Sequence, residues 1–452
     1  MMSLSPLSVA FGAGIGMLLS FLCIFLCRKY PGFDRANLVA KTILWGQGLT
    51  VCLLLPALEL PGDASRSYRS AIRFELGWLV TTTMCIVFAF ATWKIRRESS
   101  RVAKVLMVGI VGVAATQLLS SIVAEDVLPI SAYVPMLTMG VGLILFPLTF
   151  DAASKTLTHV MAVMCIVSIA TIFVDRDWAL PIAERRTIPG PFGNQSLGGV
   201  LQHPNLLAPV ASFGLALVLG GAHRNRMPLV LLFLGTIWLT DSRTQIAAAL
   251  LVLLIWCIRV SVVRFGRRTT MTLSGVVSGC VILAGFIIGL FTTWRFDSRN
   301  FGLARRPELW SKAIEYWQSS KIVGVGSAAF NKEYRLESGN RGAVGAHNQF
   351  LQSLASDGLL GVVPVLVVFC LVVYAIWREQ KMTRFAFGLV GVVGLTLFMF
   401  ETPLQLQLHR TGHVFLYVCV FAALTTAVMA SDAHGRDSSD ESSTTHEGIL
   451  ET

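Results

Sequence analysis

Residues 305–361 read RRPELWSKAIEYWQSSKIVGVGSAAFNKEYRLESGNRGAVGAHNQFLQSLASDGLLG, the longest polar passage between two apolar segments of the chain. The apolar segments near 271–293 and 358–377 have the length and composition of membrane-spanning helices. Comparable apolar runs recur along all 452 residues. The passage therefore predicts a large loop outside the bilayer, held in place by helices within it.

The composition is that of a membrane protein rather than a soluble domain. Hydrophobic residues make up 54% of the chain and charged residues only 14%, against roughly 45–50% and 25% in soluble proteins. The net charge of +11 comes mainly from short loops, where basic residues fix membrane orientation, so it does not indicate nucleic-acid binding. All nine cysteines lie in apolar runs, which excludes a disulfide framework and a cysteine-based metal site. We therefore predict an all-α polytopic membrane protein.

Apolar runs of roughly 20 residues, the length that crosses a bilayer, give about twelve or thirteen predicted spans. The count is open because the run at 227–240 is short for a span. Placing the basic short loops in the cytoplasm puts the N-terminus outside and the C-terminus inside. The predicted spans are 7–27, 37–60, 71–93, 104–123, 132–149, 156–174, 204–221, 227–240, 244–260, 271–293, 358–377, 385–403 and 412–430.

The chain is expected to divide into four parts. Residues 1–293 hold the first ten helices with an outward loop at 175–203, residues 294–357 form the large outward loop, and residues 358–430 hold the last helices. The tail at 431–452 is rich in Ser, Thr, Asp and Glu, which predicts a disordered cytoplasmic segment. The large loop carries nine basic and six acidic residues. This basic excess on the outer side favours either a polyanionic ligand or a solvated basic surface.

A first short helix is predicted at the start of the large loop. Pro307 suits an initial helical turn. Trp310, Ile314 and Trp317 then recur at i, i+4 and i+7. This stripe predicts packing against the membrane surface or the helix bundle.

A second helix is predicted near His347, after a turn at Gly324 and Gly326, and Gly358 then leads into the next span. The macrodipole disfavours an imidazolium at a helix N-terminus, so His347 is expected to stay neutral and able to accept a proton. A structural histidine is the alternative. Asn348 beside it either orients a substrate hydroxyl or caps the helix.

Arg243 interrupts two apolar runs at the predicted outer edge of the membrane. An arginine at that depth costs free energy and usually faces a cavity or a partner. Its guanidinium matches phosphate oxygens bidentately and keeps its charge, which suits a diphosphate. A local ion pair with Asp241 is the alternative.

Arg305 and Arg306 lie directly before the Pro307 helix. Helix N-terminal N–H groups together with arginines make an anion site, and a membrane-surface anchor is the alternative. Arg335 and Arg341 are further basic candidates in the same loop. These arginines are the predicted diphosphate-binding set of the loop.

Two further groups lie in the predicted outward loop at 175–203 and just after it. His203 and Asn205 are candidates for contacts with sugar hydroxyls, with turn formation or helix capping as the alternative for the asparagine. Asp175 and Asp177 have a spacing that suits a divalent cation, which is the alternative to a site without metal.

Taken together, these motifs resemble the O-antigen ligase and O-antigen polymerase family of integral-membrane glycosyltransferases. The resemblance covers about 160 residues, from 200 to 361, and the surrounding spans match in hydropathy only. It departs from the family where Arg305 stands in place of a frequent glycine, which leaves open whether Arg305 or Arg306 is the equivalent arginine. The matching segments are His203–Ala208, Ser242–Arg243, Arg306, Leu309–Trp310, Ile322–Gly326, Phe330, His347–Asn348, Leu351 and Asp357–Gly361.

The resemblance implies a C-type membrane glycosyltransferase fold. It implies transfer of a glycan from undecaprenyl diphosphate at the periplasmic face of the bacterial inner membrane, with inversion and without a metal or other cofactor. His347, Arg243 and Arg306 would be the catalytic residues. The acceptor would be lipid A–core in a ligase and another lipid-linked repeat unit in a polymerase.

We expect a ligase-like enzyme, with a polymerase of the same family as the alternative. A transporter of lipid-linked sugar is the alternative from another class. It predicts charged residues along several mid-membrane helices or paired broken helices in two halves. The chain shows no convincing internal repeat, and its charged candidates cluster on one side, so the enzyme is favoured.

Overall fold

The structure of the chain is a computed structural model that describes part of the sequence. The described residues are 41, 44–45, 101–124, 150–180, 191–193, 195–201, 203–221, 226–265, 306–326, 329–330, 334, 336, 345–381 and 385–404. Outside them lie Arg305, Arg335, Arg341, the tail, the predicted spans 7–27, 71–93, 132–149, 271–293 and 412–430, and all but three residues of 37–60.

Seven helices of the described residues coincide with predicted spans. Four of them contain a stretch long and apolar enough to cross a membrane, and three are shorter apolar helices. The described residues contain no sheet, only one isolated β-bridge between Phe192 and Gln195. The prediction of an all-α polytopic membrane protein is confirmed. The four long helices are α4 (Arg101–Val123), α6 (Phe150–Val174), α10 (Arg243–Phe265) and α14 (Gln349–Lys381), and the three shorter ones are α8 (Pro204–Gly220), α9 (Arg226–Thr240) and α15 (Phe385–Phe400).

Helix α8 forms the centre of one group of helices and packs against α6, α9, α10 and α15. Every residue from Leu207 to Leu219 is buried, as expected for a helix that is apolar all round. Gly214 lets α9 approach closely, because a Cβ there would lie 2.3 Å from the ring of Phe233. Small residues at such contacts are the usual means of close helix packing in membranes.

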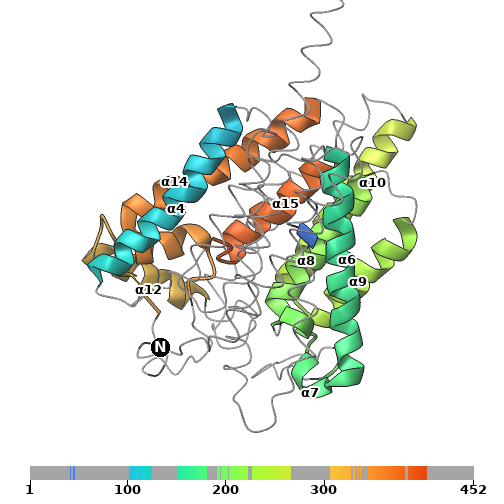
Figure 1. The fold of residues 1–452 in the computed structure, drawn as a ribbon, viewed down its shortest axis with the longest axis horizontal. Coiled ribbons are helices and arrows are strands. Elements are labelled where there is room, and N and C mark those ends of the chain that lie inside the picture. Colours follow the sequence, from blue (N-terminus) through green and yellow to red (C-terminus); the bar gives the residue numbers. More distant parts are fainter. Residues whose placement is uncertain are drawn as a thin grey trace, which may run out of the picture.

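Helix α15 joins this group to a second one formed by α4, α14 and α12 (Arg306–Ser319), as Figure 1 shows. It packs against α8 and α10 on one side and against α14 on the other. Its C-terminal end therefore lies where residues from both groups can meet. Glu401 directly follows that end, because α15 ends at Phe400.

Helix α14 is broken at Gly358, whose backbone has φ 64° and ψ −159°. The break leaves N–H groups of the next turn without their partners in the helix. The N–H groups of Leu359 and Leu360 donate instead to the carbonyls of Lys321 and Ile322, at 3.0 and 3.1 Å. The turn after α12 is thus bonded to the break in α14, which satisfies backbone groups that would be costly to bury unpaired.

Gly324 fits this contact because it has no side chain. Its φ is +69°, and a Cβ there would lie 2.4 Å from the backbone carbonyl of Ser356. The predicted turn at Gly324 and Gly326 is confirmed, since both glycines have positive φ. The α12–α14 contact therefore depends on a glycine at position 324.

Gly324→Ala is expected to lower the free energy of unfolding by more than about 1–2 kcal/mol, the cost of left-handed backbone in a residue with a side chain. The clash with Ser356 adds to this cost. A lower midpoint of thermal unfolding of the detergent-solubilised protein would show it. Gly235→Ala on α9 is the matched control, since a Cβ there meets nothing within 4 Å. Equal midpoints for the two variants would contradict the prediction.

Candidate functional site

Helix α12 begins with Arg306 and carries it on its buried side. The predicted first helix is present, with Pro307 as its second residue. Its buried side is formed by Arg306, Leu309 and Ala313, whereas Ile314 of the predicted stripe is 40% exposed. The side that packs against α14 is therefore rotated from the aromatic stripe. This rotation places the first charged residue of the helix inside the protein.

In the segment before α14, both the N–H and the carbonyl of Ala346 form hydrogen bonds with side chains. Its N–H donates to Oε1 of Gln352 at 2.7 Å, and its carbonyl accepts from Nε1 of Trp310 at 3.0 Å. His347 follows with φ +48°, an uncommon conformation for a residue with a side chain, although histidine adopts it more often than most. Such conformations are kept where the surroundings determine them, often at functional sites.

Asn348 caps α14. Its Oδ1 accepts from the N–H of Leu351 at 3.0 Å, and its Nδ2 donates to the carbonyl of Met399 at 3.1 Å. The side chain is buried. Of the two roles considered for Asn348, the structure shows the helix cap. Orientation of a substrate hydroxyl by Asn348 stays a prediction, because each end of the amide can make one further hydrogen bond.

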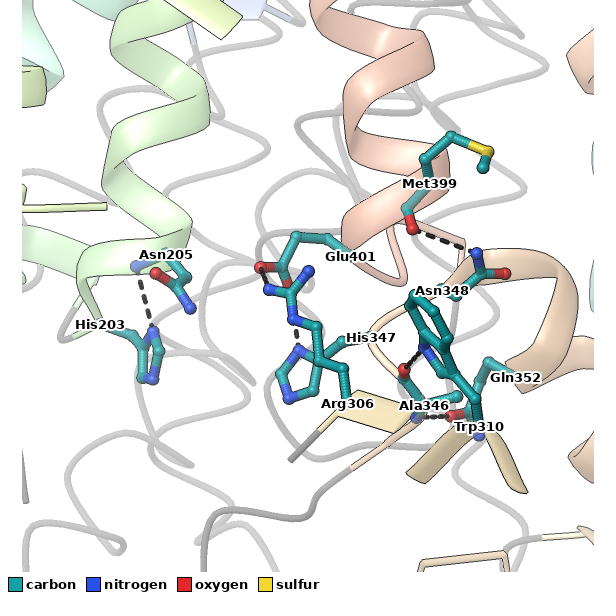
Figure 2. A network of polar contacts seen from close by, with 10 residues as sticks. All are labelled: His203, Asn205, Arg306, Trp310, Ala346, His347, Asn348, Gln352, Met399 and Glu401. Atoms are coloured by element: carbon teal, nitrogen blue, oxygen red, sulfur yellow. Dashed lines mark hydrogen bonds and ion pairs between the residues drawn. The ribbon is translucent and has the colours of Figure 1, made fainter. Parts of the chain in front are cut away.

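Glu401 contacts both His347 and Arg306 (Figure 2). Its Oε2 is 3.1 Å from Nδ1 of His347, and its Oε1 is 3.5 Å from Nη2 of Arg306. The guanidinium carbon of Arg306 also lies 5.7 Å from the ring centroid of Phe400, a cation–π distance. Three segments far apart in the sequence therefore meet here: the start of α12, the segment just before α14 and the residue after α15.

The electrostatics of this cluster depend on burial. Arg306 is only 8% exposed. Burial lowers the pKa of its guanidinium, and the Glu401 carboxylate acts in the opposite direction with a smaller effect. The guanidinium nevertheless keeps its charge, because its pKa starts far above neutral. The side chain of His347 is 24% exposed, so its ring is open to solvent or to a substrate. The cluster can thus offer a buried positive charge and an accessible imidazole side by side.

Arg243 is the first residue of α10 and is exposed. The preceding Asp241 has φ +49°, so α9 and α10 are joined by a sharp turn. Among the described residues, no ion pair connects Arg243 with the cluster around Glu401. The structure places Arg243 at a helix N-terminus, and its part in the site with His347 stays a prediction.

His203 is the residue that caps α8 (Figure 2). Its Nδ1 accepts from the N–H of Asn205 at 3.2 Å. Capping by His203 was not predicted, and sugar contacts of His203 and Asn205 stay a prediction. Asp175 follows α6, Asp177 lies in the short helix α7 (Arg176–Ala179), and both are exposed. The described part of the chain holds no group of three or more metal-ligating side chains.

Sequence reasoning missed Glu401. Position 401 was counted as part of a predicted span, 385–403, although α15 ends at Phe400. The available signal was a lone carboxylate at the outward end of a long apolar run. A charge at such a depth is costly and usually has a partner, but the sequence gives no indication which of the distant cations that partner is.

Residues 228–366 match the family model described as O-Antigen ligase. No curated protein matches the chain significantly. The matched range runs from α9 into α14 and contains Arg243, Arg306 and His347, whereas Glu401 lies beyond it. The match supports the resemblance that the motifs predicted. Over residues 228–366, the chain is therefore similar to the O-antigen ligase family.

Proposed function

We propose that the protein is an O-antigen ligase that transfers a glycan from undecaprenyl diphosphate to a hydroxyl of lipid A–core. The reaction would take place at the periplasmic face of the bacterial inner membrane. The observation that carries the proposal is the placement of an accessible imidazole, His347, beside the buried guanidinium of Arg306 in a chain of this family. A base next to a fixed positive charge suits attack by a hydroxyl on a sugar that leaves from a diphosphate.

In the proposed reaction, His347 takes the proton of the acceptor hydroxyl. The acceptor oxygen forms a bond to the anomeric carbon, and the bond from that carbon to the diphosphate oxygen breaks. The electron pair stays on the undecaprenyl diphosphate, whose growing negative charge Arg306 and Arg243 stabilise. A single displacement of this kind inverts the anomeric centre. General-base catalysis typically contributes on the order of 10²–10⁴-fold, and preorganised positive charge is usually the larger contribution.

The polymerase reaction uses the same donor and leaves the same diphosphate, so it differs only in the acceptor hydroxyl. The family match supports both reactions equally. We take the ligase as the proposal and the polymerase as its alternative. The two are separated by the product that they form.

The test is reconstitution of the purified protein in liposomes with an undecaprenyl-diphosphate glycan. Lipid A–core and a second lipid-linked repeat unit are offered as acceptors in separate reactions. A glycan attached to lipid A–core supports the ligase, whereas lengthening of the lipid-linked chain supports the polymerase. Movement of the donor across the bilayer without a new glycosidic bond would overturn the proposal in favour of a transporter.

The same assay is expected to be unaffected by EDTA, because arginine charges stabilise the leaving diphosphate in the proposed reaction. We expect the transfer rate to stay within about twofold of the untreated rate, well below the change that loss of one preorganised donor causes. A loss of activity that Mg²⁺ or Mn²⁺ restores would instead implicate Asp175 and Asp177.

A further inference from the structure

The segment that carries Glu401 is held by three side-chain amides. Asn348 Nδ2 donates to the carbonyl of Met399 at 3.1 Å, on the N-terminal side of Glu401. On the C-terminal side, the N–H of Leu404 donates to Gln349 Oε1, and its carbonyl accepts from Gln117 Nε2, both at 2.8 Å. Glu401 is thus positioned between two fixed points of the backbone.

These amides are themselves buried. Gln349 is 0% exposed and Gln117 is 2% exposed, and they come from α14 and α4 respectively. Burying an amide costs free energy unless it is hydrogen-bonded. A shift of the segment after α15 would break the hydrogen bond that each of these two amides makes to Leu404, so the surrounding helices specify where the carboxylate of Glu401 lies.

Both partners of Glu401, Arg306 and His347, are best satisfied by a hydrogen-bond acceptor. Arg306 can only donate hydrogen bonds, and a carboxylate can only accept them. The contact with Nδ1 of His347 is then best satisfied when this nitrogen carries the proton and donates it to Oε2. In the neutral ring the remaining nitrogen, Nε2, is the acceptor. Among the described residues no hydrogen bond to Nε2 is present, so this nitrogen is left for a substrate.

We propose that Glu401 is a positioning residue of the transferase. It fixes the ring orientation and the tautomer of His347 so that Nε2 faces the acceptor hydroxyl, and it keeps the guanidinium of Arg306 beside that ring. The inference rests on the proposed function, in which His347 is the base. It also reaches beyond the part of the chain that matches the family model, since that match ends at residue 366.

The test compares Glu401→Gln with wild type in the reconstituted transfer assay. Glutamine keeps the shape of the side chain but supplies one acceptor and one donor group, so it cannot accept from both Arg306 and His347. We expect kcat to fall by at least about 10-fold, and by no more than the roughly 10²–10⁴-fold that a general base contributes. The KM for the glycan donor is expected to change less than about threefold, because Glu401 does not bind substrate. Glu315→Gln is the matched control, since it removes an exposed carboxylate paired with Lys312 on α12 and is expected to leave kcat unchanged.

A double-mutant cycle separates positioning from a purely structural role. In the His347→Ala background, Glu401→Gln is expected to cost less than about threefold, because a residue that acts through the imidazole has nothing left to position. Equal costs in both backgrounds, or a Glu401→Gln enzyme with the kcat of wild type, would overturn the inference while the proposed function stands. Absence of glycan transfer by the wild-type protein would overturn the proposed function, and the inference with it.

Discussion

Replacing His347 by alanine is expected to lower glycan transfer by about 10²–10⁴-fold, the contribution typical of a general base. The imidazole is accessible, and its Nδ1 is held by Glu401, so its loss removes the proton acceptor without removing a part of the core. The helix cap is provided by Asn348 rather than by His347. The variant is therefore expected to insert in the membrane in wild-type amounts. The measurement is the initial rate of transfer to lipid A–core by equal amounts of reconstituted protein.

His347→Asn is the control for the backbone. The φ of +48° at this position is tolerated by asparagine better than by alanine, but an asparagine amide takes up no proton near neutral pH. We expect the asparagine variant to be as slow as the alanine variant. A fast asparagine variant beside a slow alanine variant would show that His347 is needed for its backbone conformation, and transfer near the wild-type rate by both would remove it from the mechanism.

Arg306→Lys is expected to lower kcat on the order of 10²-fold, the effect typical for the loss of one preorganised donor, although the formal charge is unchanged. A guanidinium offers several donors in a plane, so it can face Glu401 and still present donors to a diphosphate, whereas an ammonium is a compact point charge. The site is also buried, and burial can neutralise a lysine much more readily than an arginine.

The reverse exchange on the same helix, Lys312→Arg, is the control for this prediction. Lys312 pairs with the exposed Glu315 at 2.6 Å and lies outside the cluster around Glu401. We expect its transfer rate to equal that of wild type. Full activity of Arg306→Lys would reduce the role of position 306 to general charge and would make the neighbouring Arg305 the better candidate for specific diphosphate binding.

The parts of the site that sequence predicted are those that local pattern determines. Pro307 and the aromatic spacing after it predict a helix because they act within one or two turns. The start of a helix near His347 follows in the same way, since a polar His-Asn pair precedes an amphipathic run. Both predictions are confirmed by α12 and α14.

The parts that sequence did not predict depend on contacts between distant segments. Glu401 meets His347 54 positions away along the chain, and nothing near Glu401 in the sequence indicates this pairing. The rotation of α12 that buries Arg306 follows from packing against α14. Hydrophobic spacing alone does not predict this rotation, because Ile314 is apolar and still exposed. Whether Arg243 joins the site also depends on tertiary packing, and it stays a prediction.

The bonding of the α12 turn to the break at Gly358 has a mechanical consequence. The carbonyls of Lys321 and Ile322 accept the hydrogen bonds of N–H groups at the break in α14. We therefore expect α12, which begins with Arg306, and α14, which follows His347, to move as one rigid unit. A bilayer that changes thickness and tilts α14 would carry both residues together and preserve their spacing. The strain would fall instead on the contacts of Glu401, which connect Arg306 and His347 to the end of α15.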